Sequence, residues 1–164
     1  MASRFDIESS AFTLLKEAGV EDQYPVPLET VATYLGFKTH GFAPDEGDTI
    51  TVKVSGLIDY GSKTIYVNTT ESLARQRFTL AHEIGHAYLH RKTEGAVVDF
   101  RAEMDNPHED KEREANQFAA ALLMPREQFI RQWLQWKGDV EMLSTVFGAS
   151  KEAVKVRGKN LLAA

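Results

Sequence analysis

The sequence contains no cysteine, and this absence removes several kinds of site at once. Without thiols the 164-residue chain can form no disulfide bond, and any metal site must use histidine and carboxylate ligands. The longest apolar run, Phe118 to Met124, is far shorter than the roughly 20 residues of a membrane-spanning helix. The first residues also lack the apolar segment of a secretory signal peptide. These absences predict a protein of the cytoplasm with no membrane partner.

Positive charge is in the minority. The 19 Lys and Arg residues stand against 24 Asp and Glu residues, which leaves a formal net charge of −5. Because an acidic surface repels phosphate groups, no strong intrinsic binding to DNA is expected. A chain of this length can bury about 70% of the surface that it exposes when unfolded, which is enough for one compact core.

Among the residues that are present, the run His82-Glu83-Ile84-Gly85-His86 has the most specific chemical pattern. Apolar residues recur at helical intervals from Leu73 to His90, so a helix is expected there. Residues four apart lie on one face of a helix, and both imidazoles can therefore bind one zinc ion. Glu83 would lie beside the open coordination position as the general base of a metal-assisted amide hydrolysis. Gly85 suits either a close approach of another backbone or of substrate, or simple helix packing.

The same stretch does not supply a third metal ligand. In the long form of this motif a histidine follows six residues after the second one, and that position is Lys92 here. His90 continues the spacing of four, but a straight helix rises about 12 Å from His82 to His90, too far for both to bind one ion. We expect His90 to act as a cation or hydrogen-bond donor near the helix C-terminus.

A carboxylate from a second helix, expected around Lys111 to Leu123, is the remaining source of a ligand. Glu112 and Asn116 lie on one face of that helix together with small residues, whereas Glu114 lies about 200° around the helix axis from Glu112. This geometry favours Glu112 as the third ligand, with Glu114 as the alternative. Asn116 is expected to hydrogen-bond to a metal ligand and so orient it, without binding the metal itself. Zn²⁺ is the expected ion, although Mn²⁺ or Fe²⁺ also suits two histidines and a carboxylate.

The rest of the chain predicts an α+β fold. Before the metal helix, helical periodicity and stop signals mark two helices, and β-branched and aromatic residues mark three strands of a small, twisted, antiparallel sheet. The expected helices span 10–18 and 27–35, and the expected strands span 37–42, 49–59 and 63–68. In the second strand, Val54, Ser55 and Gly56 are predicted to bind an extended substrate at a sheet edge, where Gly56 permits close backbone approach.

After the sheet, two further segments complete the predicted organisation. Residues 93–110 connect the two metal helices, either as a lid over the cleft or as a mobile surface loop. Residues 138–164 form two short helices with helix-turn-helix-like spacing around Gly148, and we expect this tail to pack on a domain formed by residues 1–137. The basic residues of the tail, among them Arg157, are expected to form a solvated helix face.

The two motifs together resemble the ImmA/IrrE family of bacterial zinc metallopeptidases. The resemblance rests on the run from His82 to His86 and on the run from Glu112 to Pro125, which stand in the order of the family. It implies a zincin-like fold in which His82, His86 and Glu112 bind the metal and Glu83 is the general base. Gly158 stands where the family often has a larger apolar residue, so the tail is expected to dock less firmly.

The resemblance also implies a substrate class. Known substrates of the family are mostly transcriptional repressors, so we expect a zinc-dependent endopeptidase that cleaves a helix-turn-helix repressor to induce mobile-element, toxin–antitoxin or stress genes. One alternative is a metal-containing anti-repressor or binding module that sequesters its partner without cleavage, which the presence of Glu83 disfavours. Another is a DNA-binding regulator that uses the tail, which the acidic balance disfavours.

Overall fold

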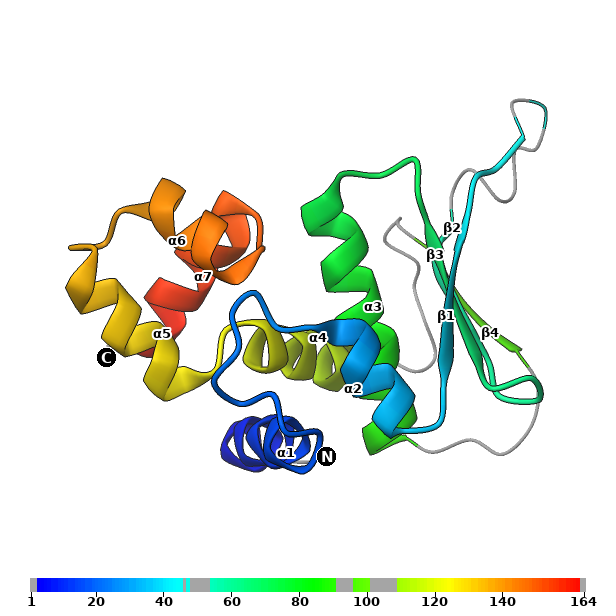
Figure 1. Ribbon diagram of the computed structural model, residues 1–164, viewed down its shortest axis with the longest axis horizontal. Helices are drawn as coiled ribbons and strands as arrows, with labels where there is room; N and C mark the ends of the chain where they lie inside the picture. Colours follow the sequence, from blue (N-terminus) through cyan, green and yellow to red (C-terminus); the bar gives the residue numbers. More distant parts are fainter. Residues whose placement is uncertain (1–2, 46, 48–53, 91–95, 101–108, 163–164) are drawn as a thin grey trace.

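The computed structural model describes residues 3–45, 47, 54–90, 96–100 and 109–162, and it confirms the predicted α+β fold (Figure 1). Helices and strands follow one another as α1 (Arg4–Glu17), α2 (Leu28–Tyr34), β1 (Lys38–Phe42), β2 (Val54–Asp59), β3 (Thr64–Asn68), α3 (Leu73–Leu89), β4 (Ala96–Phe100), α4 (Glu109–Leu123), α5 (Arg126–Gln135), α6 (Val140–Phe147) and α7 (Lys151–Leu162). None of the described helices is long and apolar enough to cross a membrane.

The elements form successive layers (Figure 1). Helix α3 packs on β2 and β3 with one side and on α4 with another, and α1 in turn packs on α4. Fully buried side chains from the sheet and both central helices meet in one core, among them Ile58, Ile65, Ile84, Phe118 and Leu122. Burial of each such side chain contributes roughly 1.5–3 kcal/mol. The metal helix is therefore held on both sides by rigid packing.

The sheet is mixed, and this corrects the expectation of a purely antiparallel sheet. Its strand order is β1-β3-β2-β4, with β2 antiparallel to both β3 and β4 but β1 parallel to β3. A tight turn joins β2 to β3, in which the Asp59 carboxylate accepts hydrogen bonds from the Gly61 and Ser62 backbone. Strand β3 runs opposite to β2 and in the same direction as β1, so its pairing with β1 is parallel.

Strand β2 lies in the interior of the sheet, so the prediction that it is an edge strand is wrong. Strand β4 pairs with it, aligning Val54 with Phe100 and Gly56 with Asp99. The segment that forms β4 is predicted from the sequence to be part of a connection, although its Val97 and Val98 are β-branched. The edges of the described sheet are β1 and β4. The other residues of that connection, 93–95 and 101–108, and residues 49–53 of the expected strand lie outside the described residues.

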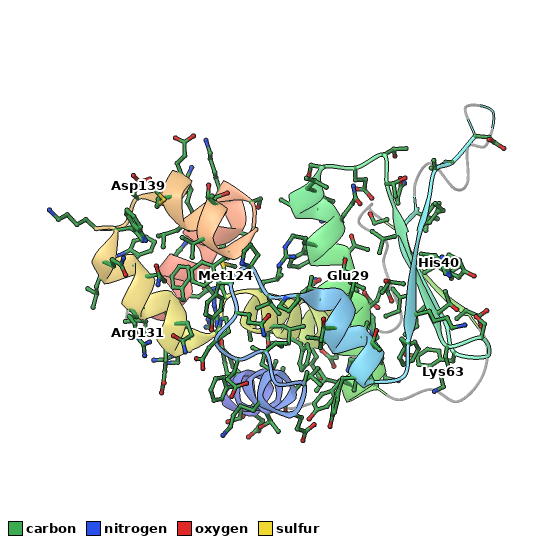
Figure 2. The ribbon with its side chains drawn as sticks, in the orientation of Figure 1. Glu29, His40, Lys63, Met124, Arg131 and Asp139 are labelled. Carbon is green, nitrogen blue, oxygen red and sulfur yellow. The ribbon has the colours of Figure 1, made fainter. Side chains whose placement is uncertain are left out.

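The C-terminal helices dock closely, contrary to the expectation drawn from Gly158. A Cβ on Gly158 would come within 2.8 Å of Cζ3 of Trp133, so the glycine lets α7 pack directly beneath that ring. Arg157 is only 4% exposed. Its guanidinium donates to the Glu8 carboxylate of α1 and to the carbonyl of Met124, which follows α4 and is labelled in Figure 2. Arg157 therefore does not belong to the solvated basic face; the division at 137/138 stays a prediction.

Candidate metal centre

The helix that carries both histidines begins with an N-terminal cap. Ser72 caps α3 by accepting a hydrogen bond from the backbone N–H of Arg75 at 3.2 Å, which satisfies one of the free donors at the helix end. From there the buried side of the helix carries His82, Glu83 and His86, which are 3%, 0% and 6% exposed. Buried polar side chains require partners, and both histidines find one in Glu112 of α4.

Close packing of α3 against α4 depends on Gly85. A Cβ on this residue would lie 3.2 Å from Cδ1 of Phe118 and 3.3 Å from the carbonyl oxygen of Ala115. These contacts are helix packing in which the backbone of α4 comes close to Gly85, so they agree with two of the uses expected from the sequence. Because Glu112 lies about one helical turn before Ala115 and Asn116 follows it directly, the close approach brings both side chains to the histidines.

Three side chains converge where a metal ion would bind. The Glu112 carboxylate lies 3.1 Å from Nε2 of His82 and 2.9 Å from Nε2 of His86, and the two Nε2 atoms lie 3.1 Å apart. Ligand atoms around a tetrahedral zinc ion, with bonds of about 2.0–2.1 Å, are separated by about 3.3 Å. The donor set therefore fits a divalent ion after an outward movement of a few tenths of an ångström. It is the one group of this kind among the described residues.

The electrostatics of this group favour a charged carboxylate. Burial by itself raises the pKa of Glu112, but hydrogen bonds from His82 and His86 outweigh burial and hold the pKa well below its usual range. The Glu112 side chain is 26% exposed, against 4% for His82 and 8% for His86. The ligand group is thus open to solvent on the carboxylate side, which leaves room for a water or a substrate carbonyl.

Asn116, which the sequence predicts to orient a metal ligand, contacts the ring of His82. Its Oδ1 lies 2.8 Å from Nδ1 of His82. An amide oxygen only accepts hydrogen bonds, so Nδ1 carries a proton in this contact, and in a neutral ring Nε2 would present its lone pair to a metal ion that replaces its contact with Glu112. Asn116 therefore orients a histidine of the group without itself reaching the ion, an arrangement that strengthens metal sites in general.

The alternative carboxylate, Glu114, is not part of the converging group. Its Oε2 lies 3.1 Å from Nε2 of His90, whose Nδ1 lies 3.1 Å from Nδ1 of His86. Burial lowers the pKa of His90, while its hydrogen bond to Glu114 acts in the opposite direction. His90 is the C-terminal cap residue of α3, so its predicted position near the helix C-terminus is confirmed. The contact of His90 with His86 is not among the contacts predicted from the sequence, although the spacing of four residues is the signal for it.

Of the residues predicted to bind substrate, Gly56 lies beside the candidate catalytic residue. A Cβ on Gly56 would lie 3.3 Å from Oε1 of Glu83 and 2.5 Å from Cγ2 of Thr79. The hydroxyl of Ser55 is buried and has no hydrogen-bond partner among the described residues. Since β2 is an interior strand, these residues, with Val54, cannot form a new strand pairing unless β4 moves. Their contact with substrate stays a prediction.

Two central helices that share one His–His–Glu group, beside a small sheet, form the arrangement that zinc metallopeptidases with this motif use. The model of the IrrE N-terminal-like domain, peptidase family M78, matches residues 42–159, so the chain belongs to this family. No curated protein matches the sequence. The fold is similar to the solved structure of a Mycobacterium tuberculosis transcriptional regulator, with a TM-score of 0.66 and 17% identity, covering 94% of this chain. This chain spans 46% of the length of that protein.

Proposed function

We propose that this protein is a zinc-dependent endopeptidase of the cytoplasm that hydrolyses a peptide bond in a helix-turn-helix transcriptional repressor. Cleavage would induce mobile-element, toxin–antitoxin or stress genes. The observation that carries the proposal is the placement of the Glu112 carboxylate against Nε2 of both His82 and His86, on the helix that also buries Glu83. Membership of a peptidase family supports the reaction class.

The metal supplies one part of this chemistry: when bound, a divalent ion acts as a Lewis acid on the carbonyl and makes water more acidic. His82, His86 and Glu112 would hold Zn²⁺, and the same donors also suit Mn²⁺ or Fe²⁺. Their nitrogen and carboxylate atoms are the ligand types available to a chain without cysteine.

Glu83 provides the proton transfers. Its carboxylate takes one proton from a water molecule, whose oxygen forms a bond to the scissile carbonyl carbon, and the proton then passes to the amine nitrogen as the C–N bond breaks. The overall change is addition of one water across the peptide bond. The side chain is fully buried, and the missing side chain of Gly56 leaves space for its Oε1. Such placement keeps the carboxylate in one position for the reaction.

The direct test is cleavage of a helix-turn-helix repressor, chosen by searching the genes that neighbour the one for this protein. The purified protein, loaded with zinc, is incubated with that repressor, and the fragments are identified by mass spectrometry. Glu83→Gln should keep bound zinc but lose cleavage by a factor on the order of 10²–10⁴, because the amide cannot accept the proton. Undiminished cleavage by Glu83→Gln would contradict the mechanism. Tight binding of the repressor without cleavage by the wild type would instead favour sequestration.

A further inference from the structure

A chain of polar contacts continues from the candidate metal group into the protein. Behind His86, its Nδ1 lies 3.1 Å from Nδ1 of His90, and Nε2 of His90 lies 3.1 Å from Oε2 of Glu114. The side chains of His90 and Glu114 are 8% and 12% exposed. The contacts are thus largely shielded from water, where a hydrogen bond has more influence on orientation than at the surface.

The chemistry of the three groups sets the direction of these hydrogen bonds. A carboxylate is only an acceptor, so the contact with Glu114 requires a proton on Nε2 of His90. In a neutral imidazole the other nitrogen, Nδ1, is then an acceptor. Nδ1 of His86 must therefore donate to it, so that when a metal ion replaces the contact between Nε2 of His86 and Glu112, a neutral imidazole presents the lone pair of Nε2 to the ion. The reverse direction would place the proton of His86 on Nε2 and exclude it as a ligand.

The geometry also shows that His90 is not itself a fourth protein ligand. Both of its ring nitrogens already have partners, since Nδ1 faces His86 and Nε2 faces Glu114. His82 has a parallel arrangement, in which Asn116 accepts from Nδ1. Glu114 and Asn116 both belong to α4, the helix that also carries Glu112.

We propose that His90 and Glu114 are positioning residues that fix the orientation and the protonated nitrogen of His86, so that helix α4 holds both metal-binding histidines from behind as well as supplying the carboxylate. This proposal rests on the metal site of the proposed function but does not require that any peptide be cleaved. It assigns to the second glutamate of the Glu112–Asn116 segment a role distinct from metal binding. Supports of this kind typically contribute about 10- to 100-fold to metal affinity.

Zinc affinity of the full-length protein, measured by competition with a chromophoric chelator, tests the proposal. His90→Phe keeps an aromatic ring but removes the acceptor, and it should weaken zinc binding by about 10- to 100-fold. His90→Asn places an amide oxygen near the former position of Nδ1 and should recover a large part of that loss. The matched control is His40→Phe, because His40 lies on β1 on the side of the sheet away from α3 (Figure 2).

Glu114 provides a second pair of variants. Glu114→Gln retains an oxygen that can accept from Nε2 of His90, so its zinc affinity should remain close to that of the wild type. Glu114→Leu removes the acceptor and should resemble His90→Phe. Equal zinc affinity in the wild type, His90→Phe and Glu114→Leu would overturn the proposal. The thermal unfolding midpoint of each metal-free variant identifies those that fold.

The wild-type protein alone also provides a test that does not depend on any variant folding. In the zinc-loaded protein, nitrogen-15 NMR of the imidazole rings should show the proton of His86 on Nδ1 and that of His90 on Nε2. A proton on Nδ1 of His90 would overturn the proposal. If zinc affinity and protonation follow these expectations but no repressor is cleaved, only the proposed peptidase function fails.

Discussion

Gly85 of α3 and Ala115 of α4 are in such close contact that a Cβ on the glycine would lie 3.4 Å from the Cα of the alanine. This contact sets the separation of the two helices at the level of the metal group. Since the ligands come from both helices, the distances of 2.9 and 3.1 Å between Glu112 and the histidines depend on it. A glycine inside a helix costs roughly 1 kcal/mol relative to alanine, and here the close helix packing offsets that cost.

Gly85→Val should therefore damage both stability and metal binding. The branched side chain would push against Phe118 and the backbone of α4, and such overpacking typically lowers the free energy of unfolding by about 1–3 kcal/mol. Displacement of α4 should also weaken zinc binding. Urea denaturation of the metal-free protein and chelator competition measure the two effects. Gly47→Val is the control, since an added Cβ there meets no described atom within 4 Å. Unchanged zinc affinity in Gly85→Val would show that this contact does not set the ligand geometry.

The choice between the two glutamates of α4 is tested by their amide variants. Glu112→Gln should lose bound zinc, because a neutral amide is a poor substitute for the carboxylate between His82 and His86. Glu114→Gln should keep it. Elemental analysis of the purified proteins gives the metal content per chain, and added zinc should raise the thermal unfolding midpoint only of proteins that bind it, an increase that EDTA removes. The opposite result, loss of metal from Glu114→Gln alone, would make Glu114 the ligand.

Gly56 is expected to be essential for the position of Glu83. A methyl group in Gly56→Ala would lie 2.5 Å from Cγ2 of Thr79 and 3.3 Å from Oε1 of Glu83, so the variant should lose most cleavage while it keeps bound zinc. The clash with Thr79 should also lower the stability of Gly56→Ala. Thr79→Ser removes Cγ2, so the double variant Gly56→Ala/Thr79→Ser should regain that stability while its cleavage stays low. Full recovery of cleavage in the double variant would mean that the clash with Thr79, rather than the position of Glu83, limits the reaction.

Arg157 should contribute to the free energy of unfolding, because its side chain is buried and paired. Arg157→Met leaves the Glu8 carboxylate and the Met124 carbonyl without their donors, and breaking a buried ion pair in this way costs about 3 kcal/mol or more. Lys155→Met, on the exposed side of α7, is the control and should change the free energy of unfolding by less than about 0.5 kcal/mol. Equal stability of the two variants, measured by urea denaturation, would contradict this role.

Local features of the sequence are sufficient to predict most elements of this fold. The helix from Leu73, the strand before Asn68 and the two C-terminal helices lie within a few residues of their expected bounds, because helical periodicity and capping residues act over a few positions. The rotation of about 100° per residue along a helix likewise separates Glu112 from Glu114, and the structure places them on different partners.

The types of ligand and their spacing on each helix follow from the residues alone, since a chain without cysteine is left with histidine and carboxylate groups as metal ligands. In contrast, the pairing of β4 with β2, the burial of Arg157 and the contacts of His90 with His86 and Glu114 appear only when the elements are packed together. Each of these contacts joins residues from separate elements. Strand pairing and side-chain burial depend on how whole elements pack, and no periodicity within one segment contains that information.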